Sequence, residues 1–131
     1  MTDIILSIHP KWAEKIYTGE KTVEVRKTRP TNWLSFPTVF VYETAPIKKI
    51  TGLFKLDWIY PMILGIDEMT CYVENLIENT CLTNEELTKY ADGKEIKFWI
   101  PKGINKFDTP KDIKGSVPQS WRYLKEGERY D

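Results

Sequence analysis

Apolar positions change their spacing several times along the chain, and each spacing predicts a different element. Residues 4–8 form a short, mostly apolar run, which predicts a buried strand. Apolar residues then recur at helical spacing from Trp12 to Tyr17, and Pro10 suits the first helical position. Gly19 follows as a residue that readily adopts the left-handed conformation of a helix end. We therefore expect a strand that runs directly into a capped helix.

The next segment, residues 21–28, carries polar side chains at every second position. Because strand side chains alternate between two faces, Val23 and Val25 point to one side of a strand here. The opposite face combines hydroxyls, a carboxylate and a guanidinium, in the order Thr22, Glu24, Arg26 and Thr28. Such a dense, mixed-charge set exceeds what a solvated strand face requires, so this face is a candidate functional site.

Further strands and a helical insert are predicted in the rest of the chain. Turn residues bound the remaining apolar runs, and an insert near residues 64–92 has helical periodicity and a capped helix start. Gly52 marks a bulge or a close approach of another segment. The closing residues 117–123 predict a turn rich in aromatics. The predicted strands are residues 38–42, 50–60, 95–100 and 104–107, and the predicted helices are residues 66–77 and 83–90.

Strands this short around one small core predict an α+β fold. We expect a mixed sheet of about five to six strands that closes into a partial barrel, with helices at its openings. The length of 131 residues suits one domain over the whole chain, 1–131.

The balance of charge restricts the kind of partner. The chain carries 19 basic and 19 acidic side chains, for a net charge of zero. General polyanion binders are usually strongly basic, so this balance argues against a long nucleic-acid groove. It leaves room for a small site with local positive charge.

Cysteine and glycine spacing argues against a metal or a cofactor. Cys71 and Cys81 fall within predicted helical sequence and match no metal-binding spacing, which is typical of reduced thiols. Gly93, Gly103 and Gly115 stand alone and form no phosphate-binding loop. The sequence shows no basic leader and no apolar run of about 20 residues, so we expect a cytoplasmic protein without membrane contact.

Positive charge is densest just after the first predicted helix. The residues concerned are Lys21, Arg26, Lys27 and Arg29, followed by Trp33. Arginine offers a planar fork for phosphate or base edges, and tryptophan offers a stacking face for an unpaired base. Lys48 and Lys49 add to this group if their strand lies alongside. The alternative is a solvated edge on which acidic neighbours neutralise the charge.

Glu24 and Arg26 lie two residues apart on one strand face, where they can form an ion pair. In a cleft, the pair would orient the guanidinium toward a ligand or keep the carboxylate ionised for base work. In bulk water the pair would contribute only about 0–1 kcal/mol. His9, the only histidine, is expected at the helix N-cap rather than in catalysis, because no nucleophile motif accompanies it.

Two other segments offer polar groups beside aromatic rings. Tyr42 and Thr44 come at a strand end, where a hydroxyl and backbone amides can contact a ligand, although a plain turn is the simpler interpretation. Gln119 and Ser120 precede Trp121 and provide the polar neighbours of a base-binding pocket. The alternative for Trp121 is a buried residue that closes the core.

Three segments together resemble the ASCH family, a branch of the PUA-like superfamily. Residues 6–10 with 19–27 are close to the family's N-terminal signature, and residues 42–54 are similar to its strand pair. Residues 104–110 with 118–123 form the third match. The resemblance implies a pseudo-barrel with a cleft facing the helix-to-strand junction.

The same resemblance implies binding of RNA or of modified nucleosides. One family branch hydrolyses an acylated cytidine, and ribonuclease activity is attributed to another. The hydrolase branch uses a lysine after the helix, a threonine, an arginine and a distant glutamate. Lys21 and Arg26 match two of these positions, whereas Glu24 occupies the threonine position. The distant glutamate remains open among Glu74, Glu78, Glu85 and Glu86.

Three functional hypotheses follow. The first is a binding module for a nucleotide or a short single-stranded RNA element. The second is a hydrolase of a modified nucleoside or of RNA, with Glu24 as general base and Lys21 as electrostatic stabiliser. The third is a protein-interaction domain. The candidate ligand-binding residues are Lys21, Arg26, Lys27, Tyr42, Thr44, Lys48, Gln119, Ser120 and Trp121.

Overall fold

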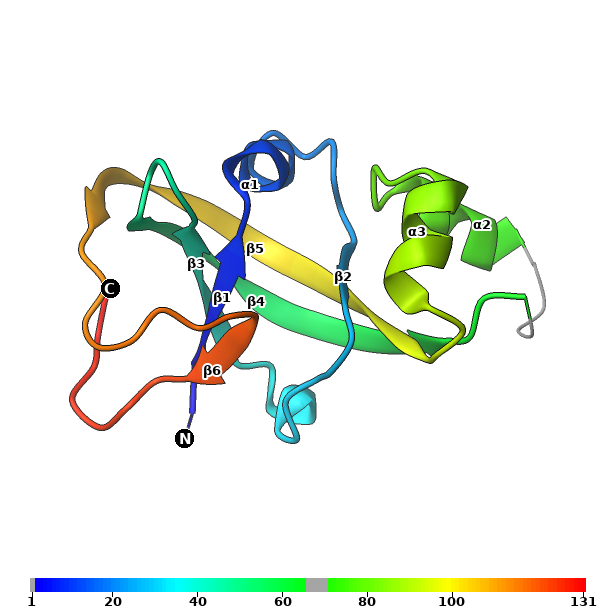
Figure 1. Ribbon diagram of the computed structural model, residues 1–131. Coiled ribbons are helices and arrows are strands. Elements are labelled where there is room, and N and C mark those ends of the chain that lie inside the picture. The colour runs from blue at the N-terminus through cyan, green and yellow to red at the C-terminus, as the bar shows by residue number, and fades with distance from the viewer. Residues whose placement is uncertain (1, 66–70) are drawn as a thin grey trace.

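A computed structural model describes residues 2–65 and 71–131 and shows one curled, six-stranded sheet (Figure 1). The sheet order is β2-β5-β4-β3-β1-β6. The strands are β1 (Ile4–Ile8), β2 (Glu24–Arg26), β3 (Thr38–Glu43), β4 (Lys49–Met62), β5 (Ile96–Lys111) and β6 (Trp121–Tyr123). The helices are α1 (Pro10–Tyr17), α2 (Cys71–Glu78), α3 (Asn84–Ala91) and the 3₁₀ turn η1 (Trp33–Ser35). The predicted α+β pseudo-barrel is confirmed.

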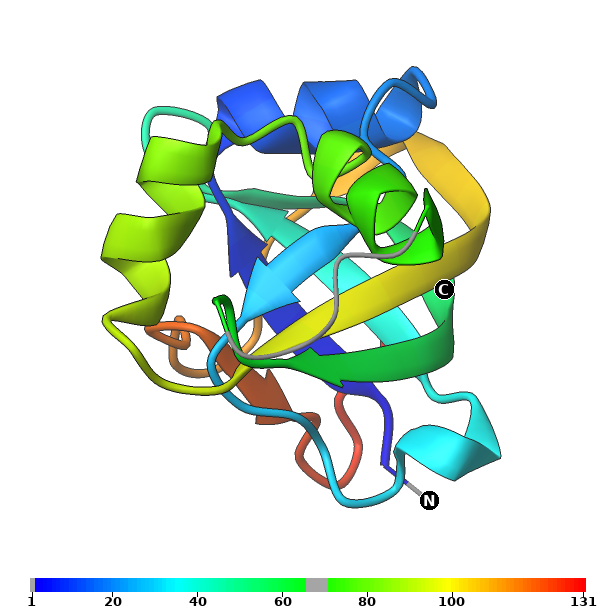
Figure 2. The same cartoon turned by 90° about the vertical axis from the view of Figure 1, so that its right-hand side faces the viewer.

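The sheet is mixed and strongly curved. β1 runs parallel to β3, and the other neighbouring strands pair antiparallel. Figure 2 looks into the curl, with α1 above the strands and α2 and α3 in front of them. The inner core is made of apolar side chains from β1, α1, β3 and β4, with Trp99 of β5 fully buried among them. A second core joins β2 and β5 to α2 and α3.

Side-chain hydrogen bonds, rather than a strand ladder, join β2 and the segment that follows it to β1 and β6. Arg26 on β2 donates to the carbonyl of Ser7 on β1 at 2.8 Å. The Trp121 indole on β6 donates to the Thr28 hydroxyl at 2.8 Å. The Thr31 amide donates to the Tyr123 hydroxyl at 3.1 Å. We call this line of contacts the seam.

The predicted strand over residues 21–28 is shorter in the structure. Val23 and Val25 are buried in the second core, as expected from the alternation. However, the amides of Thr22 and Val23 donate to the carbonyl of Asn79, at 3.1 and 3.2 Å. The segment before Glu24 is therefore tied to the end of α2 instead of continuing a ladder.

The prediction of two separate strands at 95–100 and 104–107 is wrong, because β5 is continuous. Pairing with β4 continues past Pro101. The register of the two strands shifts beside this residue, so the ladder accommodates a proline that has no amide hydrogen to donate. The closing residues 117–123 contain strand β6 instead of a simple turn, because Trp121–Tyr123 pair antiparallel with β1.

The helical insert agrees with the prediction in part. α2 and α3 occupy it, and residues 66–70 of the first expected helix lie outside the described residues. Cys71 is helical as expected, but Cys81 follows α2 with a φ of 62°, so its expected place in a helix is wrong. None of the helices within residues 2–65 and 71–131 has the length and apolar character that a membrane crossing requires.

Gly52 is a close-approach point, as the sequence predicts. A Cβ at this position would lie 2.5 Å from the carbonyl oxygen of Asn105 and 2.5 Å from the hydroxyl of Tyr17. The backbone of β5 cannot yield without breaking its pairing with β4. Gly52→Ala is therefore expected to lower the free energy of unfolding by about 1–3 kcal/mol, measured by urea denaturation. Thr109→Ala on the exposed part of β5 is the control, and equal stability of both variants would contradict this packing.

Candidate functional site

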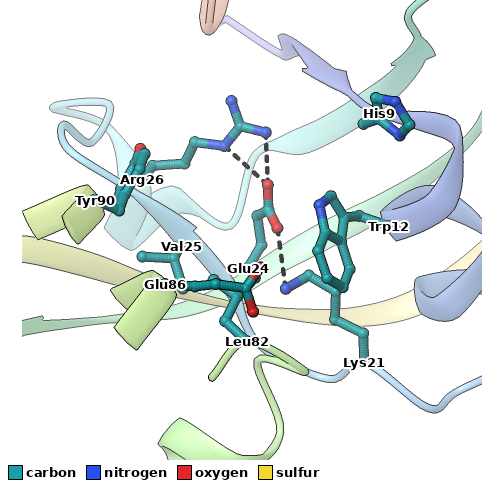
Figure 3. Close-up of a pocket in the computed structure, with 9 residues that line it drawn as sticks. All are labelled: His9, Trp12, Lys21, Glu24, Val25, Arg26, Leu82, Glu86 and Tyr90. Atoms are coloured by element: carbon teal, nitrogen blue, oxygen red, sulfur yellow. Dashed lines mark hydrogen bonds and ion pairs between the residues drawn. The ribbon is translucent and has the colours of Figure 1, made fainter. Parts of the chain in front are cut away.

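A pocket of about 310 Å³ opens between α1, β2 and α3. α1 contributes Trp12, with His9 at its N-cap, and α3 contributes Glu86 and Tyr90. Its remaining lining residues are Lys21, Glu24, Val25, Arg26 and Leu82. Figure 3 shows the carboxylate of Glu24 between the guanidinium of Arg26 and the ammonium of Lys21.

The floor of the pocket is a group of three charges, of which Lys21 and Glu24 are buried and Arg26 is half-buried. Nε and Nη2 of Arg26 donate to Oε2 of Glu24 at 2.9 and 2.6 Å. Nζ of Lys21 lies 3.5 Å from the other carboxylate oxygen, and the side chains of Lys21 and Glu24 are only 2% and 7% exposed. At this burial, the charges interact far more strongly than a surface pair would. The three groups act as one unit, and we call them the charge triad.

The charge triad has one more positive charge than negative charge when both bases are protonated. Burial lowers the pKa of the Lys21 ammonium, and the nearby Glu24 carboxylate opposes this effect. Lys21 also donates to the carbonyl of Thr80 at the end of α2. One carboxylate thus serves two cations, and an anionic group at the pocket floor would complete the balance.

The two cations retain unused hydrogen-bond donors. Arg26 has five N–H groups, and four of them are used: two on Glu24, one on the Ser7 carbonyl and one on Ser120 Oγ at 3.2 Å. Lys21 has three donors, of which Thr80 and Glu24 occupy two. Within the described part of the chain, each cation thus has one donor left for a ligand.

Two aromatic rings flank the charge triad. The ring of Trp12 lies 5.2 Å from Nζ of Lys21, and the ring of Tyr90 lies 4.8 Å from Nζ of Lys27. Burial raises the pKa of the Tyr90 hydroxyl, although the charge of Arg26 acts in the opposite direction. In Figure 3 Tyr90 lies beside Arg26 and Trp12 beside Lys21, so the two rings form aromatic walls at the two ends of the triad, on which a flat group can stack.

Helix capping places the residues at the mouth of the pocket. Nδ1 of His9 accepts the amide hydrogen of Lys11 at 3.3 Å, which is the N-cap role expected of this residue. Thr83 and Glu86 form a capping box at the start of α3. The Thr83 amide lowers the pKa of the Glu86 carboxyl by donating to it. Glu86 is exposed, so solvent screens its charge more than that of the buried triad.

The structure brings some of the predicted ligand-binding residues together. Lys21, Glu24 and Arg26 form the pocket floor, Ser120 contacts Arg26, and Lys27 lies beside Tyr90. Trp121 is half-buried beside this group, and its ring packs edge-on against Trp99 at 6.1 Å. Gln119 is exposed next to Ser120.

Three predicted residues lie elsewhere. Tyr42 is buried in a core with Phe40 and Tyr130 and does not line the pocket. Thr44 uses its amide to bind the carbonyl of Ile8, at the end of β1. Lys48 lies in the turn between β3 and β4 with a φ of 54°. The strand of Lys48 and Lys49 therefore adds no charge to the pocket lining.

Trp12, Leu82 and Tyr90 line the pocket without having been candidates from the sequence. Trp12 lies on the apolar stripe of α1, where a core role is the ordinary expectation. Tyr90 lies near the end of α3, and no local pattern in the sequence predicts that this helix packs against β2. The distant glutamate left open in the insert has one representative in the pocket, Glu86, whereas Glu74 and Glu78 line a separate surface hollow.

A family model for the ASCH domain matches residues 6–107, which include the charge triad and α1. This chain belongs to the ASCH domain family. Solved structures of an ASCH protein from Zymomonas mobilis share its fold at 20–21% identity. A variant and the unmodified protein superpose with TM-scores of 0.78 and 0.76, over 95% of this chain and 89% and 88% of theirs.

Two sequence relatives carry functional names. An "ASCH domain-containing ribonuclease" of Zymomonas mobilis is 37% identical over 63 residues, which are 44% of this chain and 42% of the relative. A "Large ribosomal subunit protein uL22" of Ureaplasma parvum serovar 3 is 29% identical over 130 residues, or 93% of this chain. The ASCH chain spans only 39% of the length of that relative.

The described residues offer no ready metal site. Within residues 2–65 and 71–131, no group of three or more His, Cys, Asp or Glu side chains is placed to hold a metal ion.

The charge triad predicts an asymmetric response to substitution. Glu24→Gln leaves two buried cations without a counter-charge and is expected to lower the free energy of unfolding by about 3–5 kcal/mol. Lys21→Met leaves the Glu24–Arg26 pair intact, so its cost should stay below about 2 kcal/mol, mainly from the lost hydrogen bond to Thr80. Urea denaturation at neutral pH measures both. Equal losses, or a harmless Glu24→Gln, would contradict the surplus of positive charge.

Proposed function

We propose that this ASCH protein binds a nucleotide or a short single-stranded RNA element in the pocket beside α1 and β2. The carrying observation is the charge triad, in which the buried Lys21 and the half-buried Arg26 share one carboxylate and each has a donor to spare. A phosphate or a base carbonyl provides the acceptor that these donors need. Zero net charge of the chain agrees with a small, selective site.

The neighbouring groups support recognition of a base as well as a phosphate. Trp12 and Tyr90 provide stacking faces, and Lys27 adds charge beside Tyr90. Ser120 and the exposed Gln119 provide neutral donors and acceptors near Arg26. Base stacking with a few polar contacts is the common way in which proteins read unpaired RNA.

The relatives agree with an RNA-related role in general. One carries the name of a ribonuclease and another that of a ribosomal protein, and both proteins act with RNA by those names. Residues 1–131 are proposed to act as a single domain, because the sheet takes strands from both ends of the chain. The free thiols of Cys71 and Cys81 are in keeping with a cytoplasmic location.

A direct test measures the affinity for uridine monophosphate and for short oligouridine by calorimetry. Lys21→Met is expected to weaken both at least about tenfold, because it removes a charged hydrogen bond. Lys49→Met is the matched control, since Lys49 is paired with Asp112 outside the pocket. Affinity should fall as salt is added, and the logarithm of the association constant should change with the logarithm of the salt concentration with a slope of about −0.7 to −1.4, as expected for one or two phosphates. An unchanged affinity in Lys21→Met, or a slope near −6, would contradict the proposal.

Hydrolysis of RNA or of a modified nucleoside is the second candidate function. It is favoured by the 3.5 Å distance between Nζ of Lys21 and the buried Glu24 carboxylate, which places a cation beside a candidate base. In this scheme Glu24 accepts a proton from the water that attacks the phosphorus or acyl carbon, and Lys21 stabilises the developing negative charge. The bond to the leaving oxygen or nitrogen then breaks, and protonated Glu24 returns its proton to that atom. The scheme requires the ligand to loosen the two bonds from Arg26 to Glu24, because both now engage the carboxylate.

Turnover of labelled oligonucleotides and acylated nucleosides tests this second function. Glu24→Gln should abolish turnover while binding persists, assayed at a temperature where circular dichroism shows the variant folded. Lys21→Met, which keeps the Glu24–Arg26 pair, should also lose turnover by about 10²-fold or more. Absence of turnover in the intact protein would exclude hydrolysis of these substrates, and the binding function would remain.

A further inference from the structure

A second surface of the molecule gathers exposed aromatic and aliphatic side chains. Leu34, Phe36 and Trp58 are 63, 46 and 48% exposed, and all come from η1, its end, or the facing part of β4. The ring of Trp33 meets that of Trp58 edge-on at 4.9 Å. We call Trp33, Leu34, Phe36 and Trp58 the aromatic platform. In Figure 1 the cyan turn η1 lies near the bottom of the view, on the side of the sheet away from α1.

Two backbone irregularities lie within this platform. The register of β4 against β5 shifts between Leu56 and Trp58, opposite Pro101, which breaks the alternation of buried and exposed positions. Phe36 has a φ of 53°, in the left-handed region that bulky side chains rarely adopt. The rings at these two positions, Trp58 and Phe36, both remain exposed. Such features recur where a fold presents side chains to a ligand.

Cations lie next to the rings of the platform. The guanidinium of Arg29 is 5.9 Å from the ring centre of Trp33, and Nζ of Lys102 is 5.1 Å from that of Phe36. Lys102 also pairs with Asp57 at 3.1 Å, which neutralises part of this charge. Arg29 takes part in none of the ion pairs found within residues 2–65 and 71–131. The platform therefore has an exposed guanidinium without a counter-ion.

We propose that the aromatic platform is a second contact for single-stranded RNA. Unpaired bases stack on Trp58 and Phe36, and Arg29 binds the phosphate between the platform and the pocket. The inference rests on the proposed RNA-binding function and extends it from one nucleotide to a longer strand. Its occupant is RNA because an unpaired guanidinium and a lysine adjoin exposed rings, and single-strand binders combine cations for the backbone with rings on which bases stack.

The course of the chain links the platform to the pocket. Arg26 lines the pocket, and Trp33 begins η1 seven residues later, so the two lie at most about 25 Å apart. Arg29 lies between them in the sequence. The intervening Thr28 and Thr31 contact Trp121 and Tyr123 along the seam. A strand of several nucleotides could thus follow the seam from one site to the other.

Binding assays with two different ligands distinguish the contribution of the platform from that of the pocket. Fluorescence anisotropy of labelled oligouridine of about ten nucleotides reports on both sites, and calorimetry with uridine monophosphate reports on the pocket. Trp58→Ala and Arg29→Gln should each weaken the oligonucleotide at least about fivefold, as expected for one stacked base or one phosphate contact. Neither variant should change the affinity for uridine monophosphate. Tyr72→Ala is the control, because Tyr72 is an exposed ring on α2 outside the platform.

The outcomes distinguish this inference from the function on which it rests. If the platform variants leave oligonucleotide affinity unchanged while Lys21→Met weakens it, the platform is no RNA contact and the pocket function stands. If the platform variants weaken the oligonucleotide and Lys21→Met does not, the inference stands and the pocket function fails. Failure of the intact protein to bind either ligand would overturn both. Thermal melting of Trp58→Ala and Arg29→Gln is the check that both variants are folded under the conditions of the binding assays.

Discussion

The ion pair between Glu24 and Arg26 is the interaction on which both the fold and the site depend. Arg26 belongs to one edge strand of the sheet, and it reaches across the seam to the Ser7 carbonyl on β1 and to Ser120 before β6. Glu24 fixes the guanidinium through two hydrogen bonds, so the fork cannot rotate away. A contact that closes the barrel therefore also forms the floor of its pocket.

This double role explains why the pocket has charge to spare. Arg26 uses two donors on Glu24 and two across the seam, on the Ser7 carbonyl and the Ser120 hydroxyl, and Glu24 is shared between Arg26 and Lys21. Lys21 in turn anchors the end of α2 through Thr80. A ligand that adds one negative charge would stabilise the strand edge and the helical insert together, because β1, β2 and the end of α2 are all bonded to the charge triad.

Much of this arrangement is readable from the sequence, because it depends on local patterns. Alternation in residues 21–28 predicts that Val23 and Val25 turn into the core, and the structure buries both in the second core, although Val25 also borders the pocket. The close approach at Gly52 and the capping role of His9 are likewise local. The aromatic walls are not, because Trp12 and Tyr90 reach the pocket only through the docking of α1 and α3 around β2. Pro101 was wrongly predicted to end a strand, because an irregularity in strand register allows a residue without an amide hydrogen to remain within β5.

The central claim is that one ligand engages the charge triad and the aromatic walls together. The most direct measurement is a nuclear magnetic resonance titration with uridine monophosphate, following the Arg26 Nε–H and the Trp12 indole N–H signals. The account predicts that both signals shift along one binding curve, whereas the Trp58 indole signal stays in place. Shifts confined to residues outside the pocket, or no shift of Arg26 at saturation of binding, would contradict it.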